Sequence, residues 1–177
     1  MAYPTSKPFN PTSDNLKLAL PHLAFEINHF RAFWRLDEKF LSGPSPGDLI
    51  IQAVRYGSLL HFRVLLEFFY DEAGKDDIVA HHFRGLQGVD IVFLDSLRKP
   101  PTWLYMLRVN LDKLLAHLTE SRWADDRPER NYYSGRFAEL DEVINRFLYM
   151  LPEPHRGLLK SRVDEFERAN APKYRTN

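Results

Sequence analysis

Apolar residues recur every three or four positions near the beginning of the chain, and this period is typical of one face of an α-helix. The residues that form this stripe are Leu16, Leu20, Leu23, Ile27, Phe30 and Trp34. The preceding segment TSDN offers a capping residue for the helix start. Because Pro21 falls inside the stripe, we expect the helix either to kink or to begin again there.

The next helix is predicted over residues 47–71 and is the most apolar of the chain. The segment SGPSPGD breaks the chain before it, and Ser45 with Pro46 and Asp48 suits a helix start. At about 100° per residue, apolar side chains cover most of its circumference, as in helices that neighbours bury on several sides. We therefore expect this helix to be central, with His61 pointing into the bundle.

Two further stripes predict a third and a fourth long helix. The third is expected to be capped by Thr102. Its stripe consists of Leu104, Leu107, Leu111, Leu114 and Leu118. The fourth is expected to be capped by Ser134, after a loop with the sequence WADDRPERNYYSG. Its stripe consists of Phe137, Leu140, Ile144, Phe147 and Leu148.

The remaining segments give shorter elements. DIVAHHF suggests a short amphipathic turn, and residues 84–99 suggest an irregular segment packed on the bundle. A last helix is predicted from Leu158 to about Arg168. The chain is therefore expected to be all-α, with one up-and-down bundle of four to five helices over residues 13–170. Residues 1–12 are expected to form a flexible arm, and 171–177 a tail.

Composition narrows the classes of function. Lysine plus arginine and aspartate plus glutamate each total 24, so the net charge is zero and no binding of duplex DNA is expected. The chain has no cysteine, which excludes disulfides, a thiolate nucleophile and cysteine-bound zinc. The polar, proline-rich N-terminus is unlike a signal peptide, and no apolar run approaches the roughly 18 residues of a membrane span. A cytoplasmic protein without membrane contact is expected.

Candidate chemistry begins with His61, which stands among apolar residues of the second helix. It is either a core histidine bonded to one partner or part of a functional polar cluster. Its best candidate partner is His117 or an acid from another helix. Arg63 and Glu67 lie four residues apart, so they are expected to form a salt bridge along the helix, and Glu67 is also a candidate binding residue.

The end of the third helix carries a second group of polar residues. Asn110 and His117 are expected on one flank of its leucine stripe, as candidate binding and catalytic residues. His117, Thr119 and Arg122 form either a cap at the negative end of the helix or part of a site.

A metal site is considered at one place in the sequence. Asp76 and Asp77 precede His81 at spacings that could place an acid and a histidine on one helix face. The two acids also suit a helix N-terminus, which explains the same residues without a metal. No cofactor is expected.

Three segments, HFRVLLEFFY, KDDIVAHHF and DKLLAHLTESR, resemble an uncharacterised family of bacterial helical proteins. Its pattern is HxRxLxxFF, then DD(I/V)xA, then HLTxxR, and the resemblance covers roughly residues 16–122. More distantly, the chain resembles HEPN-like helical bundles, many of which are nucleases of toxin–antitoxin and defence systems. Their signature is an arginine followed four to six residues later by a histidine. Arg55 and His61 have this spacing but lie about 120° apart around a helix.

The hypothesis from sequence is a non-enzymatic binding or interaction protein that forms a homodimer and has a protein or an RNA as partner. It rests on the lack of a catalytic motif and on a surplus of aromatic residues that one core would not hide. These are Phe33, Trp34, Phe68, Phe69, Tyr70, Trp103 and Trp123.

Two enzymes are the alternatives. One is a metal-independent ribonuclease with His61 or His117 as general acid or base and Arg63 or Arg122 stabilising the phosphate charge. The other is a metal-dependent hydrolase built on the acids and histidines of residues 76–82.

Overall fold

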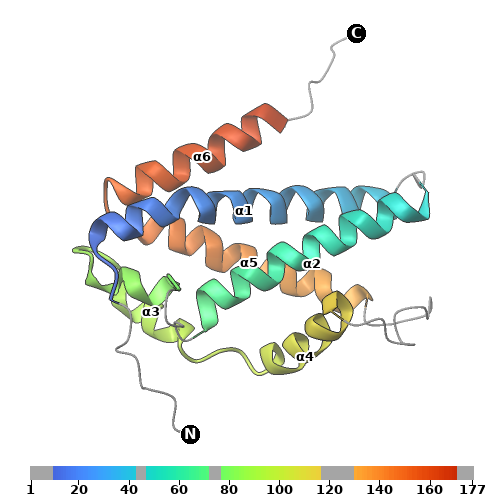
Figure 1. The fold of residues 1–177 in the computed structure, drawn as a ribbon, viewed down its shortest axis with the longest axis horizontal. Helices are drawn as coiled ribbons and strands as arrows, with labels where there is room; N and C mark the ends of the chain where they lie inside the picture. Colours follow the sequence, from blue (N-terminus) through green and yellow to red (C-terminus); the bar gives the residue numbers. More distant parts are fainter. Residues whose placement is uncertain (1–9, 43–46, 72–76, 117–129, 171–177) are drawn as a thin grey trace, which may run out of the picture.

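The computed structural model describes residues 10–42, 47–71, 77–116 and 130–170, and these contain helices and no strand. The elements, shown in Figure 1, are α1 (Ser13–Ser42), α2 (Asp48–Tyr70), the 3-10 helix η1 (Ala80–Gly85), α3 (Ile91–Leu97), α4 (Trp103–Ala116), α5 (Arg130–Met150) and α6 (His155–Asn170). The predicted all-α class is confirmed. The described residues contain more helices than the four to five expected.

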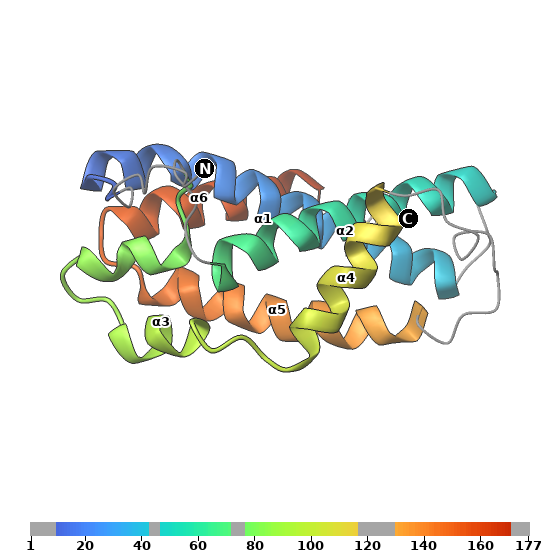
Figure 2. The same ribbon diagram turned by 60° about the horizontal axis from the view of Figure 1, so that its bottom comes forward.

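Four long helices form the body of the molecule. α1 and α6 run in one direction, and α2 and α5 run in the other (Figure 1). α4 lies at a steep angle to these four helices, while η1 and α3 lie at the end where α1 begins and α5 ends (Figure 2). The core therefore runs along the length of the bundle.

The predicted stripe of α1 is confirmed. Leu16, Leu20, Leu23, Ile27 and Phe30 are buried, and Trp34 packs against the core. The helix start is a capping box in which Thr12 Oγ1 accepts from Asn15 N and Asn15 Oδ1 accepts from Thr12 N. Pro21 lies within one continuous helix. The helix therefore does not end and begin again at the proline.

α2 differs from the prediction at its start and in its burial. Its N-cap is Gly47, at φ 99°, and no side chain caps it; Ser45 and Pro46 lie outside the described residues. In its first half Leu49 and Ile50 are exposed, so neighbours do not bury this helix on several sides throughout. It is the one helix of the described residues whose length and mean hydropathy reach those of a membrane span.

Residues 84–99 are not irregular as predicted, because α3 occupies Ile91–Leu97. Asp90 is its N-cap and accepts from Phe93 N at 2.9 Å. Phe93, Leu94 and Leu97 are buried and have the spacing of one helix face. The cap and this short stripe together explain why the segment is helical.

The fourth predicted helix begins earlier than expected. α5 starts at Arg130, so Ser134 lies inside it and does not cap it. The stripe predicted for this helix, from Phe137 to Leu148, is buried as expected. In the third predicted helix Leu104, Leu107 and Leu111 are buried, which confirms the described part of that stripe.

Candidate functional site

His61 lies in α2 and is held by a carboxylate of α1. Its Nδ1 donates to Oε2 of Glu26 at 2.7 Å, and the two side chains are 12% and 24% exposed. Its ring stacks on Phe33, with 5.8 Å between centroids and 13° between planes. Of the two partners expected for His61, the structure shows the acid from another helix, and the alternative, His117, lies outside the described residues.

A second histidine, His29 of α1, lies beside His61, with 5.2 Å between ring centroids. Its Nδ1 donates to the carbonyl oxygen of Phe25 at 2.8 Å, and its ring also contacts Phe166 of α6. In the neutral rings Nε2 is then the acceptor nitrogen of each histidine. No pattern in the sequence pointed to His29 or Glu26, because both lie beside the apolar stripe of α1 and belong to no motif.

The arginines of α2 bond to carboxylates. Arg63 Nε donates to Glu67 Oε1 at 3.0 Å, which confirms the predicted pair. Arg55 Nε donates to Asp37 of α1 at 2.9 Å. Arg55 and His61 therefore bond to different acids of α1, as their separation around the helix predicts.

A cavity of about 350 Å³, here called the acidic cavity, lies between α1, α2 and residues 77–79. The carboxylates in its lining belong to Glu26, Glu67, Asp71 and Asp77. The first three bond, respectively, to His61, Arg63 and Arg108. His61 and Arg63, which the sequence predicted on α2, thus bond two of the four acids, Arg108 of α4 bonds a third, and most of the charge of the cavity is balanced by the protein itself.

The candidate metal ligands do not form a metal site among the residues that the structure describes. Asp77 lines the acidic cavity, whereas Asp76 lies outside the described residues. His81 is in η1, where burial and the charges of Arg98 and Arg84 lower its pKa. Over residues 10–42, 47–71, 77–116 and 130–170, no three histidine, aspartate or glutamate side chains are grouped to hold a metal ion.

The second predicted group is largely outside the described residues. His117, Thr119 and Arg122 all follow the last described residue of α4. Asn110 lies within α4, and only its backbone is described.

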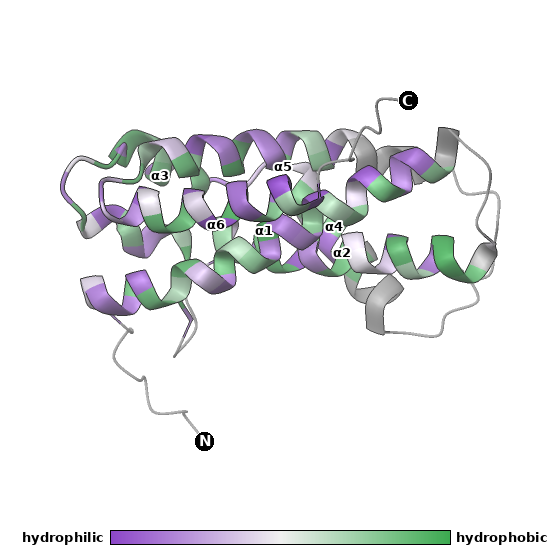
Figure 3. Cartoon of the chain, turned by 90° about the horizontal axis from the view of Figure 1, so that it is seen from above, coloured by the Kyte–Doolittle hydropathy of each residue, from purple (hydrophilic) through white to green (hydrophobic). Residues whose placement is uncertain are grey.

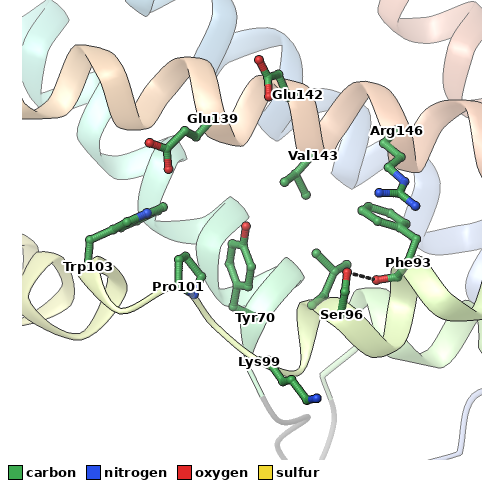
Figure 4. Close-up of a pocket in the computed structure, with 11 residues that line it drawn as sticks. Tyr70, Phe93, Ser96, Lys99, Pro101, Trp103, Glu139, Glu142, Val143 and Arg146 are labelled. Atoms are coloured by element: carbon green, nitrogen blue, oxygen red, sulfur yellow. Dashed lines mark hydrogen bonds between the residues drawn. The ribbon is translucent and has the colours of Figure 1, made fainter.

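A second cavity, of about 370 Å³, lies where α5 passes the end of α2 and the connection between α3 and α4 (Figure 4). We call it the aromatic cavity, because Tyr70, Phe93 and Trp103 line it. The hydroxyl of Tyr70 points toward α5 (Figure 4). Burial, with the negative charge of Glu139, raises the pKa of Tyr70 to about 12, so its phenol is neutral at pH 7.

A charged side chain lies at each end of the aromatic cavity. Glu139 lies at the Trp103 end, and Arg146 lies over the ring of Phe93 at 4.4 Å from its centroid (Figure 4). Nη2 of Arg146 also donates to Asp90 at 3.0 Å. The sequence named Tyr70 and Trp103 only as surplus aromatic residues and did not predict this cavity, because its lining comes from separate segments of the chain.

Comparison of the chain with protein-family models, curated proteins and solved structures gives no match. The functional argument therefore rests on the geometry of this chain.

Proposed function

We propose that the protein is a non-enzymatic interaction protein of the cytoplasm, HEPN-like in outline, that pairs with a second copy of itself through α2. The observation that carries this proposal is an uncovered apolar stripe along the most apolar helix. The all-helical architecture agrees with the HEPN-like outline.

The stripe consists of the exposed Leu49, Ala53 and Leu60 together with the half-buried Tyr56, at steps of four, three and four residues. Leu49 is 83% exposed and Leu60 is 49% exposed. Figure 3 shows hydrophobic residues gathered in the first turns of α2. These steps are the heptad spacing with which one helix packs along another. A second helix is therefore a suitable cover for the stripe.

The stripe is complementary to itself in an antiparallel arrangement. If two copies of α2 meet about a twofold axis, Leu49 of one copy would face Leu60 of the other. Ala53 would then face Tyr56, which places a small side chain opposite a large one. A twofold interface requires this kind of self-complementarity.

The other faces of α2 support packing within a protein over insertion into a membrane. Arg55 and His61 bond to carboxylates of α1, and Arg63 bonds to Glu67. The aromatic residues named from the sequence contribute less to the surface than expected. Phe69 is buried, and Phe33, Trp34, Phe68, Tyr70 and Trp103 are half-buried. Trp123 lies outside the described residues. The uncovered apolar surface of α2 comes mainly from aliphatic side chains.

Sedimentation equilibrium across the micromolar range tests the proposal. We expect the wild type to dimerise and Leu60→Arg to weaken dimerisation by about 100-fold or more, because it buries two unpaired charges. The matched control is Leu18→Arg, which changes a 71% exposed leucine of α1 outside the stripe and should leave the dimer intact.

Two outcomes would contradict the proposal. A monomeric wild type over the whole concentration range would remove the homodimer. RNA cleavage by the wild type that is lost in folded His61→Ala would support the ribonuclease alternative, in which the Glu26 carboxylate orients His61 as a general base.

A further inference from the structure

The aromatic cavity has opposite charges at its two ends. Glu139 and Arg146 are seven residues apart on α5, so they lie on the same face and about 10 Å apart along the helix axis. Both line the cavity, and so does Glu142, although its carboxylate points away from Tyr70 (Figure 4). Lys99, at the far rim, also points away from α5 (Figure 4). The cavity is therefore bipolar.

The space between the two charges is apolar on the side of α2, α3 and Val143, whereas Glu142 and Ser96 add polar groups to the lining. Tyr70, Leu97 and Val143 line it, and Leu97 is buried. The phenol of Tyr70 is the polar group among these three, and it is a neutral donor or acceptor. A ligand that lies between the charges therefore needs an apolar middle part.

The Glu139 end has the chemistry of a cation site. The guanidinium of Arg136 lies over the Trp103 ring at 4.9 Å from its centroid and also bonds Glu139. An indole face and a carboxylate together attract ammonium and guanidinium groups. Arg136 already contacts both groups, so a ligand's ammonium group would have to displace its guanidinium.

The Arg146 end has the chemistry of an anion site. Its Nη2 bonds to Asp90, and the rest of the guanidinium fork has donors in the geometry that suits a carboxylate. The side chain is fixed from below by the ring of Phe93, which is buried. A positioned guanidinium loses less conformational entropy when it binds an anion.

We propose that the aromatic cavity binds a short peptide with free termini, about three residues long, with its ammonium group at Glu139 and Trp103 and its carboxylate at Arg146. Three extended residues span about 10 Å, which matches the separation of the two charges. An apolar central side chain would contact Tyr70, Leu97 and Val143. A volume of about 370 Å³ lies within the range of small-ligand sites.

Isothermal titration calorimetry with the tripeptide Ala-Leu-Ala tests the proposal on the full chain. We expect N-acetylation and C-amidation each to weaken binding by about tenfold or more, because each removes one charge-assisted contact. Failure of the free tripeptide to bind at millimolar concentration would overturn the proposal. Equal binding of the free and blocked peptides would also overturn it.

Two variants of the protein test which terminus of the peptide binds at which end of the cavity. In Glu139→Gln, N-acetylation should have no further effect, whereas C-amidation should still weaken binding. In Arg146→Gln the pattern should be reversed. Glu165→Gln and Arg162→Gln are the matched controls, because both residues are exposed on α6 and outside the cavity lining, and they should bind as the wild type does. If both blocking groups act equally in all four variants, the proposed orientation is wrong. Circular dichroism of each variant verifies that it is folded.

Discussion

At the scale of single residues, Gly57 explains how α1 and α2 approach each other beside His61. A Cβ atom added at Gly57 would lie 2.9 Å from two ring carbons of Phe33, closer than packed side chains allow. The same ring stacks on His61, so it is held from two sides. Glycine at this position thus lets the stack of Phe33 on His61 form close to the α2 backbone.

Gly57→Ala is expected to lower the free energy of unfolding by about 1–2 kcal/mol, because the strain of overpacking exceeds the gain in helix propensity. Gly135→Ala in α5 is the matched control, since a Cβ there has no atom within 4 Å. That substitution should raise the free energy of unfolding by up to about 1 kcal/mol. Urea denaturation measures both values. Equal stabilisation by the two substitutions would show that Phe33 does not limit the approach of the helices.

The acid that bonds His61 was predicted from the sequence only as a type of residue. The sequence predicted either His117 or an acid from another helix, and the structure identifies the acid as Glu26, which is 35 positions earlier in the chain. Helical periodicity places His61 on the inner side of α2, but it does not say which residue of a neighbouring helix lies opposite. The neighbouring His29 was missed for the same reason.

At the scale of elements, α3 shows how a short helix depends on its cap. Seven residues give too few turns for a clear apolar period, and such a helix is marginal without packing. Asp90 accepts from Phe93 N and from Arg146 of α5, so one side chain caps α3 and connects it to α5. These interactions, first the backbone hydrogen bond and then Arg146, lower the pKa of Asp90.

Asp90→Ala is expected to lower Tm at pH 7 by about 2–4 °C, through loss of the cap and of the contact with Arg146. Because the pKa of Asp90 is lower in the folded state, its contribution is complete above the ordinary value of 3.8. The stabilisation that Asp90 provides is lost as the pH falls through the lowered pKa that Asp90 has in the folded protein. The difference in Tm between wild type and variant should therefore shrink below pH 3.8.

Thermal melts monitored by circular dichroism between pH 7 and pH 2 measure this difference. Asp95→Ala provides the comparison, because Asp95 lies inside α3 and pairs with Arg84 at 3.4 Å on the surface. Its effect should be smaller at neutral pH. An Asp90→Ala difference that stays constant down to pH 2 would mean that ionised Asp90 does not stabilise α3.

At the scale of the whole molecule, one arginine joins three of the four long helices. Arg31 of α1 is 8% exposed. Its Nε donates to Asp141 at 2.6 Å, and its Nη2 donates to Asn145 at 2.7 Å, both in α5. Its Nη1 lies 3.6 Å from Glu167 of α6. Charges this far from water need such partners, so Arg31 fixes how α5 and α6 pack on α1.

Arg31→Met is expected to lower the free energy of unfolding by about 3 kcal/mol, because it leaves the partially buried Asp141 without its cation. Arg35→Met is the matched control, since Arg35 is also on α1 and bonds Glu167 at 3.0 Å from a 63% exposed side chain. It should cost less than about 1 kcal/mol. Chemical denaturation compares the two, and equal losses would show that burial does not strengthen the Arg31 contacts.

The sequence by itself determined the helical class and the buried stripes of α1 and α5. These follow from periods of three and four residues within one segment, which depend only on local helix geometry. It also determined the pair Arg63 and Glu67, which lie one turn apart. The start of α5 and the existence of α3 were predicted wrongly, because a cap or a short stripe has alternatives that only packing decides.

Only the tertiary structure decided which part of α2 is covered and which residues meet across helices. Apolar residues surround α2 on most sides, so its sequence does not show that Leu49 and Leu60 remain exposed. The partner of His61, the partners of Arg31 and the two ends of the aromatic cavity each combine residues from separate segments. Their distances depend on how the helices pack, and that packing is a property of the whole chain.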